Sequence, residues 1–257
     1  MKKLLLFLIL SVFLLIQVNF AQTADDVIKQ ADNLAREFQH KKVLELLQKA
    51  DKDYPNNWQI KWRLSRAYVD VGEHLPDKTD KDKEEQFEYY KKAFEYADQS
   101  VKLAPNESIT YVRRAIANGR IALFQGVFSA IGTVKDVKAD CEKAIQLGNG
   151  GNYVQALAHY VLGRTHLKVC EKSYLVRLPL GLGWGDTAKA LKLLETANKL
   201  YPNFRMFMLE LAKAYIAEDQ PEKAKETLKK LEKAPVQDED DDLVLAEAKK
   251  LYDSIKK

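Results

Sequence analysis

The chain has 257 residues, 46% of them hydrophobic and 30% charged, so it is long enough for one extended domain or two small ones. Its 41 basic and 37 acidic residues nearly balance, which argues against a protein that binds nucleic acid through a basic surface. Only 11 glycines and 7 prolines occur in a chain rich in Ala, Leu and Lys, and this composition favours helix throughout.

The first 21 residues have the pattern of a secretory signal peptide. Lys2 and Lys3 precede an apolar run of 13 residues, Leu4–Ile16, and Ala21 supplies a small residue for cleavage. The run is shorter than the roughly 20 residues that a membrane-spanning helix needs. We therefore expect cleavage near Ala21, a mature chain of residues 22–257 and a periplasmic or secreted location. An uncleaved anchor is the alternative.

Three Pro-Asn pairs divide the mature sequence. They stand at Pro55-Asn56, Pro105-Asn106 and Pro202-Asn203, and each ends one apolar-periodic stretch and precedes the next. Proline cannot continue a helix and asparagine is a favoured N-cap, so each pair is expected to separate two helical hairpins, with the Asn as the cap. The pattern predicts an all-α array of about five hairpins and a C-terminal capping helix over 238–254.

Small and large apolar residues recur at the same offsets within the hairpins. Small residues where two helices cross allow them to approach closely. The pattern resembles the tetratricopeptide repeat, and it is clearest in Leu211-Ala212-x-x-Tyr215 with Ala224 and in Leu162-Gly163-x-x-His166 with Ala190 and Pro202. The resemblance implies a right-handed α-α superhelix over residues 22–257. It is weakest in the third unit, where Gly148-Asn149 replaces the Pro-Asn pair.

The hairpin boundaries are too far apart for plain repeats. They are separated by 50, 44 and 53 residues, against about 34 in a tetratricopeptide repeat, so inserts are expected at 72–86, 126–133 and 171–186. This layout, with Ala158–Arg164 and the glycine-rich third insert, resembles the regulator-of-microtubule-dynamics branch of repeat proteins. The resemblance implies a non-catalytic helical-repeat protein. The secretory signal departs from a cytosolic microtubule role, so that role is not carried over.

Neither an enzyme nor a bound cofactor is expected. The sequence shows no nucleophile elbow, zinc-protease helix or P-loop. Gly181–Asp186 has closely spaced glycines, but no strand precedes it and no Gly-Lys-Ser/Thr follows it. We therefore expect a turn with buried Leu178, Leu180, Leu182 and Trp184, which ends in Asp186 as the cap of the next helix.

A bound metal and a disulfide are also not expected. His166 and Cys170 are four residues apart on one expected helix, but a closed zinc site needs four ligands, so a core histidine is favoured. Cys141 and Cys170 are expected at opposite ends of two antiparallel helices, which favours free thiols. His40 and His74 are expected to stand isolated, in a turn and a loop.

The first helix of each hairpin is expected to line the concave side of the superhelix. The residues that should point inward, judged from their offsets to the small crossing residues, combine positive charge with aromatic rings; they are Trp62, Arg66, Arg120, Tyr160, Arg164, Lys168 and Lys213. Such a groove suits a protein or peptide segment that carries acidic residues or a C-terminal carboxylate. An ordinary solvated helix surface is the alternative.

We therefore interpret the protein as a non-catalytic scaffold of the bacterial envelope that binds an extended partner segment in this groove. The alternative function is a small-ligand or lipid-binding accessory protein of a membrane transporter, with the apolar insert Tyr174–Trp184 as a lid. That alternative includes peripheral association with the membrane.

Overall fold

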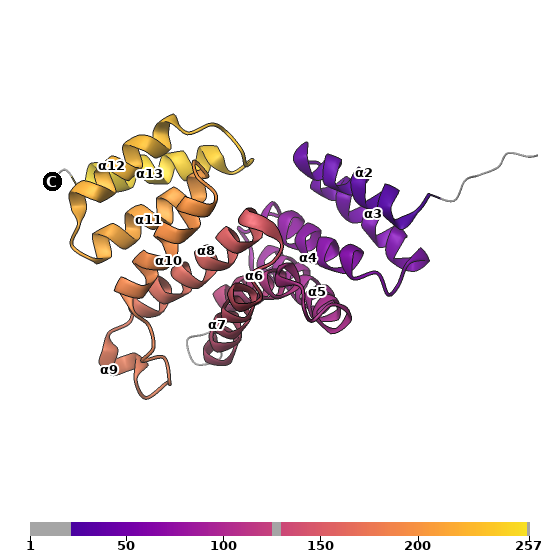
Figure 1. The fold of residues 1–257 in the computed structure, drawn as a ribbon, viewed down its shortest axis with the longest axis horizontal. Helices are drawn as coiled ribbons and strands as arrows, with labels where there is room; N and C mark the ends of the chain where they lie inside the picture. The colour runs from indigo at the N-terminus through magenta and orange to yellow at the C-terminus, as the bar shows by residue number, and fades with distance from the viewer. Residues whose placement is uncertain (1–21, 125–129, 256–257) are drawn as a thin grey trace, which may run out of the picture.

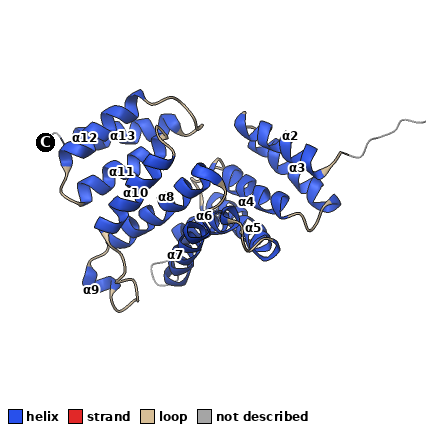
Figure 2. Cartoon of the chain, viewed as in Figure 1, coloured by secondary structure: helices blue, strands red, loops and turns tan. Residues whose placement is uncertain are grey.

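The computed structural model describes residues 22–124 and 130–255, and within these residues it contains helices and no strand (Figure 2). None of the helices in these two ranges has the length and hydropathy of a transmembrane span. In chain order the helices are α2 (Ala24–Arg36), α3 (His40–Asp53), α4 (Trp58–Glu73), α5 (Asp80–Leu103), α6 (Ser108–Phe124), α7 (Ala130–Leu147), α8 (Gly151–Cys170), α9 (Tyr174–Arg177), α10 (Thr187–Leu200), α11 (Arg205–Ala217), α12 (Pro221–Lys233) and α13 (Asp241–Ile255).

The helices form five hairpins that stack in chain order: α2/α3, α4/α5, α6/α7, α8/α10 and α11/α12. Helix α13 packs on α11 and α12 and covers the last hairpin. The first helices of successive hairpins contact one another, so α2, α4, α6, α8 and α11 line the inside of the arch in Figure 1. The predicted all-α superhelix of five hairpins with a capping helix is therefore confirmed.

The Pro-Asn pairs form the turns between hairpins, but their asparagines do not cap the next helix. Between α3 and α4, the Tyr54 carbonyl accepts the Asn57 N–H at 3.1 Å, which places Pro55 and Asn56 at the centre of a β-turn. The side chain of Asn57 then caps α4. Asn203 has a φ of 63°, in the left-handed region that asparagine tolerates better than most residues. The turns were predicted correctly, whereas the capping role was assigned one residue too early.

The expected inserts differ in kind. The stretch 72–86 is mostly the end of α4 and an extended start of α5, because the extra length forms additional helical turns. Residues 126–129 lie outside the described residues, and 130–133 form the first turn of α7. The stretch 171–186 is a long irregular connection that contains the short helix α9, and Asp186 caps α10 by accepting the Lys189 N–H at 2.8 Å, as predicted.

Close helix crossing depends on small residues inside each hairpin. Alanines at these positions are almost fully buried, including Ala31, Ala93 and Ala212. At the crossing of α8 with α10 the small residue is Gly163. A methyl group on Gly163 would lie 2.7 Å from Leu194 Cγ and 3.2 Å from the backbone oxygen of Ala190. The fourth hairpin therefore requires glycine at its crossing point.

Two glycine substitutions should have opposite effects on stability. Gly163→Ala forces α8 and α10 apart and should lower the free energy of unfolding by about 1–3 kcal/mol. Gly119→Ala, on α6 with no atom within 4 Å of the added methyl, should raise it by about 0.5–1 kcal/mol because alanine favours helix. Chemical denaturation of both variants measures the difference, and an equal effect of the two would contradict the crossing geometry.

Candidate functional site

The inner wall of the arch carries four arginines, here called the arginine cluster: Arg66 on α4, Arg113 and Arg120 on α6, and Arg164 on α8. Helix α6 contacts both α4 and α8, so the four side chains share one surface. Burial, followed by the like charge of Arg66, lowers the pKa of Arg113. Burial, followed by the like charge of Arg164, lowers the pKa of Arg120. Members of the cluster therefore lie close enough for their like charges to repel one another.

Carboxylates from the same wall pair with three members of the cluster. Arg66 Nε donates to Asp70 Oδ2 at 3.2 Å, Arg120 forms an ion pair with Glu73, and Arg164 Nε lies 3.9 Å from Glu210 Oε1. Lys213 shares Glu210 with Arg164 and also contacts Glu247 at 2.9 Å. These ion pairs hold the side chains in place and cancel much of their charge.

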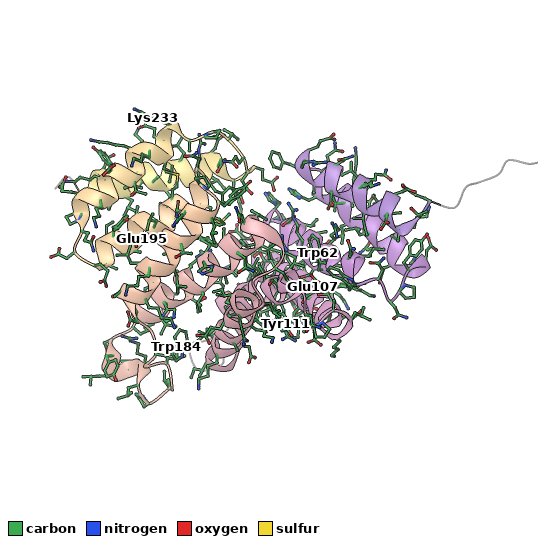
Figure 3. The ribbon with its side chains drawn as sticks, viewed as in Figure 1. Trp62, Glu107, Tyr111, Trp184, Glu195 and Lys233 are labelled. Carbon is green, nitrogen blue, oxygen red and sulfur yellow. The ribbon has the colours of Figure 1, made fainter. Side chains whose placement is uncertain are left out.

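Arg113 is the exception. It makes no hydrogen bond or ion pair within residues 22–124 and 130–255, its side chain is only 8% exposed, and its Nε is buried without an acceptor. Its guanidinium lies 5.7 Å from the ring centroid of Trp62, which sits on α4 near the centre of the array (Figure 3). A desolvated cation without a counterion is unfavourable in the free protein. An incoming carboxylate would relieve that cost.

The residues predicted for this wall fall into two groups. Trp62, Arg66, Arg120, Arg164 and Lys213 take part in the network just described. Tyr160 and Lys168 differ from the expectation. The Tyr160 ring is 4% exposed and stacks on Phe207 at 4.7 Å, so it belongs to the core and only its hydroxyl reaches Arg164. Lys168 pairs with Glu171 near the end of α8, away from the cluster.

Sequence reasoning missed Arg113. Arg113 is not among the residues expected from the offsets, and its neighbour Val112 is completely buried in the core. The spacing of seven residues between Arg113 and Arg120 carries the missed signal, because residues seven apart lie on the same face of a helix.

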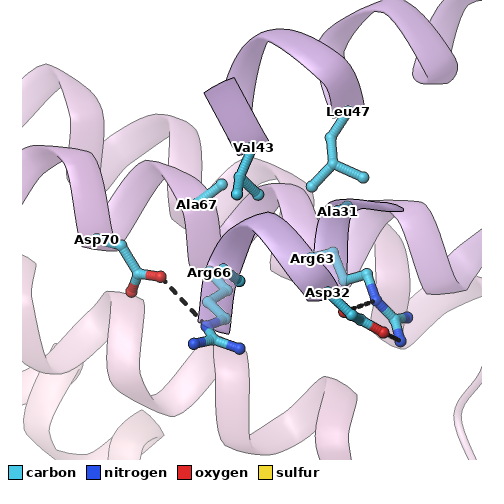
Figure 4. A pocket seen from close by; sticks show the side chains of 9 residues that line it. Ala31, Asp32, Val43, Leu47, Arg63, Arg66, Ala67 and Asp70 are labelled. Carbon is cyan, nitrogen blue, oxygen red and sulfur yellow. Dashed lines mark hydrogen bonds and ion pairs between the residues drawn. The ribbon is translucent and has the colours of Figure 1, made fainter. Parts of the chain in front are cut away.

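Two pockets formed by described residues differ in size and place. A pocket of about 10 Å³ between α2, α3 and α4 holds about one water molecule (Figure 4). Its polar edge is occupied by two ion pairs, Arg66 with Asp70 and a bidentate pair of Arg63 with Asp32 at 2.8 Å. A pocket of about 310 Å³ lies elsewhere, between α5, α6 and α7. Of the arginine cluster, only Arg66 lines either of these two pockets.

The apolar insert Tyr174–Trp184 projects from the edge of the array beyond α8 and α10 (Figure 1). The expectation of a buried turn is only partly correct, because Leu182 is buried and Leu180 and Trp184 are half-buried, whereas Leu178 is 51% exposed. Leu175, in the same insert, is 83% exposed. Neither of the two pockets described above is lined by the insert, so it is not placed as a lid over them.

Among the histidines and cysteines considered in the sequence, only His40 and His74 depart from the expectation. His166 is a core residue, as predicted: its Nδ1 accepts the Asp186 N–H at 3.2 Å, and burial lowers its pKa to about 4. Cys141 is buried, Cys170 is half-buried, and both are free. The expectation that His40 and His74 are isolated is wrong, because their rings stack with centroids 5.3 Å apart.

Comparisons with known proteins agree with this architecture. Residues 27–256 match the family described as regulator of microtubule dynamics protein 1-3. The regulator of microtubule dynamics protein 1 of Bos taurus is 26% identical over 233 residues, which cover 88% of this chain and 70% of that protein.

Solved structures show the same fold at low identity. TTC0263, a thermophilic TPR protein of Thermus thermophilus, superimposes with a TM-score of 0.65 at 16% identity, covering 88% of this chain and 98% of that one. A double mutant of MamA RS-1 superimposes with a TM-score of 0.50 at 15% identity, covering 91% of this chain and 99% of that one.

Two adjacent arginines on α6 should respond oppositely to the same substitution. Arg113→Met removes an unpaired buried charge, keeps an apolar stem against Trp62 and should raise the free energy of unfolding by about 1 kcal/mol.

Arg114→Met provides the matched comparison. Arg114 donates to Asp140 at 2.7 and 2.9 Å and to Asp98 at 2.8 Å, and Asp140 is itself 6% exposed. Its loss leaves a buried carboxylate unpaired and should lower the free energy of unfolding by about 3–5 kcal/mol. Urea denaturation at neutral pH measures both values. A destabilisation by Arg113→Met as large as that by Arg114→Met would show that Arg113 has a structural partner.

Proposed function

Because this chain belongs to the regulator of microtubule dynamics protein 1-3 family and folds as a tetratricopeptide-type superhelix, we propose that it is a non-catalytic scaffold that binds an extended, acidic segment of a partner protein along its inner wall. One observation carries the proposal: in the middle of that wall Arg113 lies buried and has no ion-pair partner among the described residues. A partner carboxylate would supply the missing charge.

The geometry accounts for the kind of ligand. A guanidinium offers two parallel N–H donors to a carboxylate, and the low local dielectric at a buried site strengthens that interaction. Trp62 presents an aromatic face beside Arg113 for the apolar part of the ligand side chain. Asp70, Glu73 and Glu210 already neutralise the neighbouring basic groups, so attraction is concentrated at Arg113.

We also propose that the protein works in the bacterial envelope or outside the cell. The support is the Lys2-Lys3 start, the apolar run and Ala21, all of which lie outside the described residues. N-terminal sequencing of the protein purified from the envelope should therefore begin at Gln22. A sequence that begins at Met1 would overturn the proposed cleavage.

Binding of acidic peptides should depend on the arginine cluster. Fluorescence anisotropy can compare a labelled peptide rich in Glu and ending in a free carboxylate with the same peptide amidated and with its Glu residues changed to Gln. We expect the first to bind most tightly and its affinity to fall with rising salt, because part of the attraction is between charges at the protein surface. Arg113→Gln, Arg164→Glu and Trp62→Ala should each weaken binding about tenfold or more.

The matched control is Lys230→Glu, which reverses an exposed charge on α12 that pairs with Glu226 outside the inner wall. It should change the affinity less than about twofold, since rim and remote charges contribute little. Unchanged affinity in folded Arg113→Gln and Arg164→Glu proteins would exclude the inner wall as the binding surface.

A further inference from the structure

Three side chains that are far apart in the sequence meet where the two ends of the array approach each other. His40 is the first residue of α3, His74 follows α4, and Glu239 lies in the loop before α13. In Figure 1 this loop reaches from the last hairpin toward the first. One ligand-type atom from each of the three residues lies within 4.8 Å of the other two.

The ring of His74 is oriented for coordination. Its Nδ1 lies 2.6 Å from the backbone oxygen of Asp70, and a carbonyl can only accept, so Nδ1 carries the hydrogen. The lone pair of the neutral ring is then on Nε2, which lies 3.3 Å from Glu239 Oε1 and 3.6 Å from Asp240 Oδ1. A backbone carbonyl that fixes one ring nitrogen is typical of histidines that bind a metal through the other.

His40 presents its Nε2 to the same carboxylate. That atom contacts Glu239 Oε1, yet it is buried and has no hydrogen bond of acceptable geometry. The other nitrogen, Nδ1, lies 3.6 Å from Asp70 Oδ2, which is beyond hydrogen-bond distance. The side chain is 11% exposed and stacks on His74 with an interplanar angle of 13°. The Nε2 atoms of both histidines and the Glu239 carboxylate thus converge, and all three atoms can coordinate a cation once the ring nitrogens carry no hydrogen.

The loop that carries Glu239 is held in place. The buried carboxylate of Asp241 accepts the N–H groups of Gln237 and Asp238 at 2.7 and 3.1 Å. The Gln237 side chain also donates to the Asn203 carbonyl at 3.0 Å, which ties the loop to the turn before α11. Glu239 is therefore positioned before any ligand arrives, and a preorganised ligand loses little entropy on binding.

We propose that His40, His74 and Glu239 bind a divalent transition-metal ion, of which Zn²⁺ fits best, with Asp240 as the fourth protein ligand or water in that position. Two imidazole nitrogens and one carboxylate oxygen are a ligand set that zinc uses, whereas Mg²⁺ and Ca²⁺ prefer oxygen ligands alone. The ion would join the first two hairpins to the C-terminal cap and hold the arch closed beside its inner wall.

The test is a titration of tag-free protein with zinc chloride, followed by calorimetry. We expect one saturable site, with Ca²⁺ and Mg²⁺ giving no comparable binding. His40→Ala, His74→Ala and Glu239→Gln should each weaken zinc binding by about a hundredfold, because each removes a direct ligand. His159→Ala is the matched control, since His159 is a half-buried helical histidine that contacts the Gln155 carbonyl, and it should bind zinc like the unaltered protein.

Two further measurements separate coordination from simple folding effects. Co²⁺ should give visible absorption bands of a tetrahedral site in the unaltered protein and lose them in Glu239→Gln, whose loop keeps its Asp241 contacts. Zinc should raise the melting temperature of the unaltered protein and not that of Glu239→Gln. Absence of a saturable zinc site would overturn the proposal. Zinc binding that survives in folded His40→Ala and His74→Ala proteins would show that the ion binds elsewhere and would overturn it as well.

Discussion

Every feature of this protein depends on the close crossing of paired helices. A single hairpin cannot bury its apolar flank, so each must press that flank against the next one, and small residues at the crossing points permit the approach. At the crossing of α8 with α10, even a methyl group on Gly163 would collide with Leu194. Stacking in one direction places α4, α6, α8 and α11 side by side, and the inner wall is a direct consequence of that order.

On the inner wall, ion pairs fix most of the basic side chains, and Arg113 differs from them. Ion pairs to Asp70, Glu73 and Glu210 fix most of the basic groups and reduce their pull on a ligand. Arg113 remains desolvated beside Trp62 without such a partner, an arrangement that lowers stability and favours binding. Polar groups without a partner lower the stability of a protein, and they are expected at functional sites, where the ligand supplies the missing partner.

The ends of the array give the wall a second level of organisation. Repeat superhelices are usually open, with each unit touching only its neighbours. This protein differs, because Glu239 in the loop before α13 contacts His40 and His74 of the first two hairpins. A bond across this gap would limit the bending of the arch, and thereby the space beside the arginine cluster. The arginine cluster and the proposed metal site bind different ligands, but both depend on the curvature of the stack.

Local sequence determined the helices, the turns and the small crossing residues, because backbone sterics and helix periodicity act over a few residues. Pro55-Asn56, Asp186 and Gly163 all act within that range, and even the misplaced cap at Asn56 was wrong by only one residue. Tertiary structure alone decided the rest. Packing of one hairpin on the next buried Tyr160 against Phe207 and left Arg113 without an ion-pair partner among the described residues. The curvature of the whole stack brought His40 and His74 to Glu239. Those outcomes depend on small rotations summed over many hairpins, and no stretch of sequence records that sum.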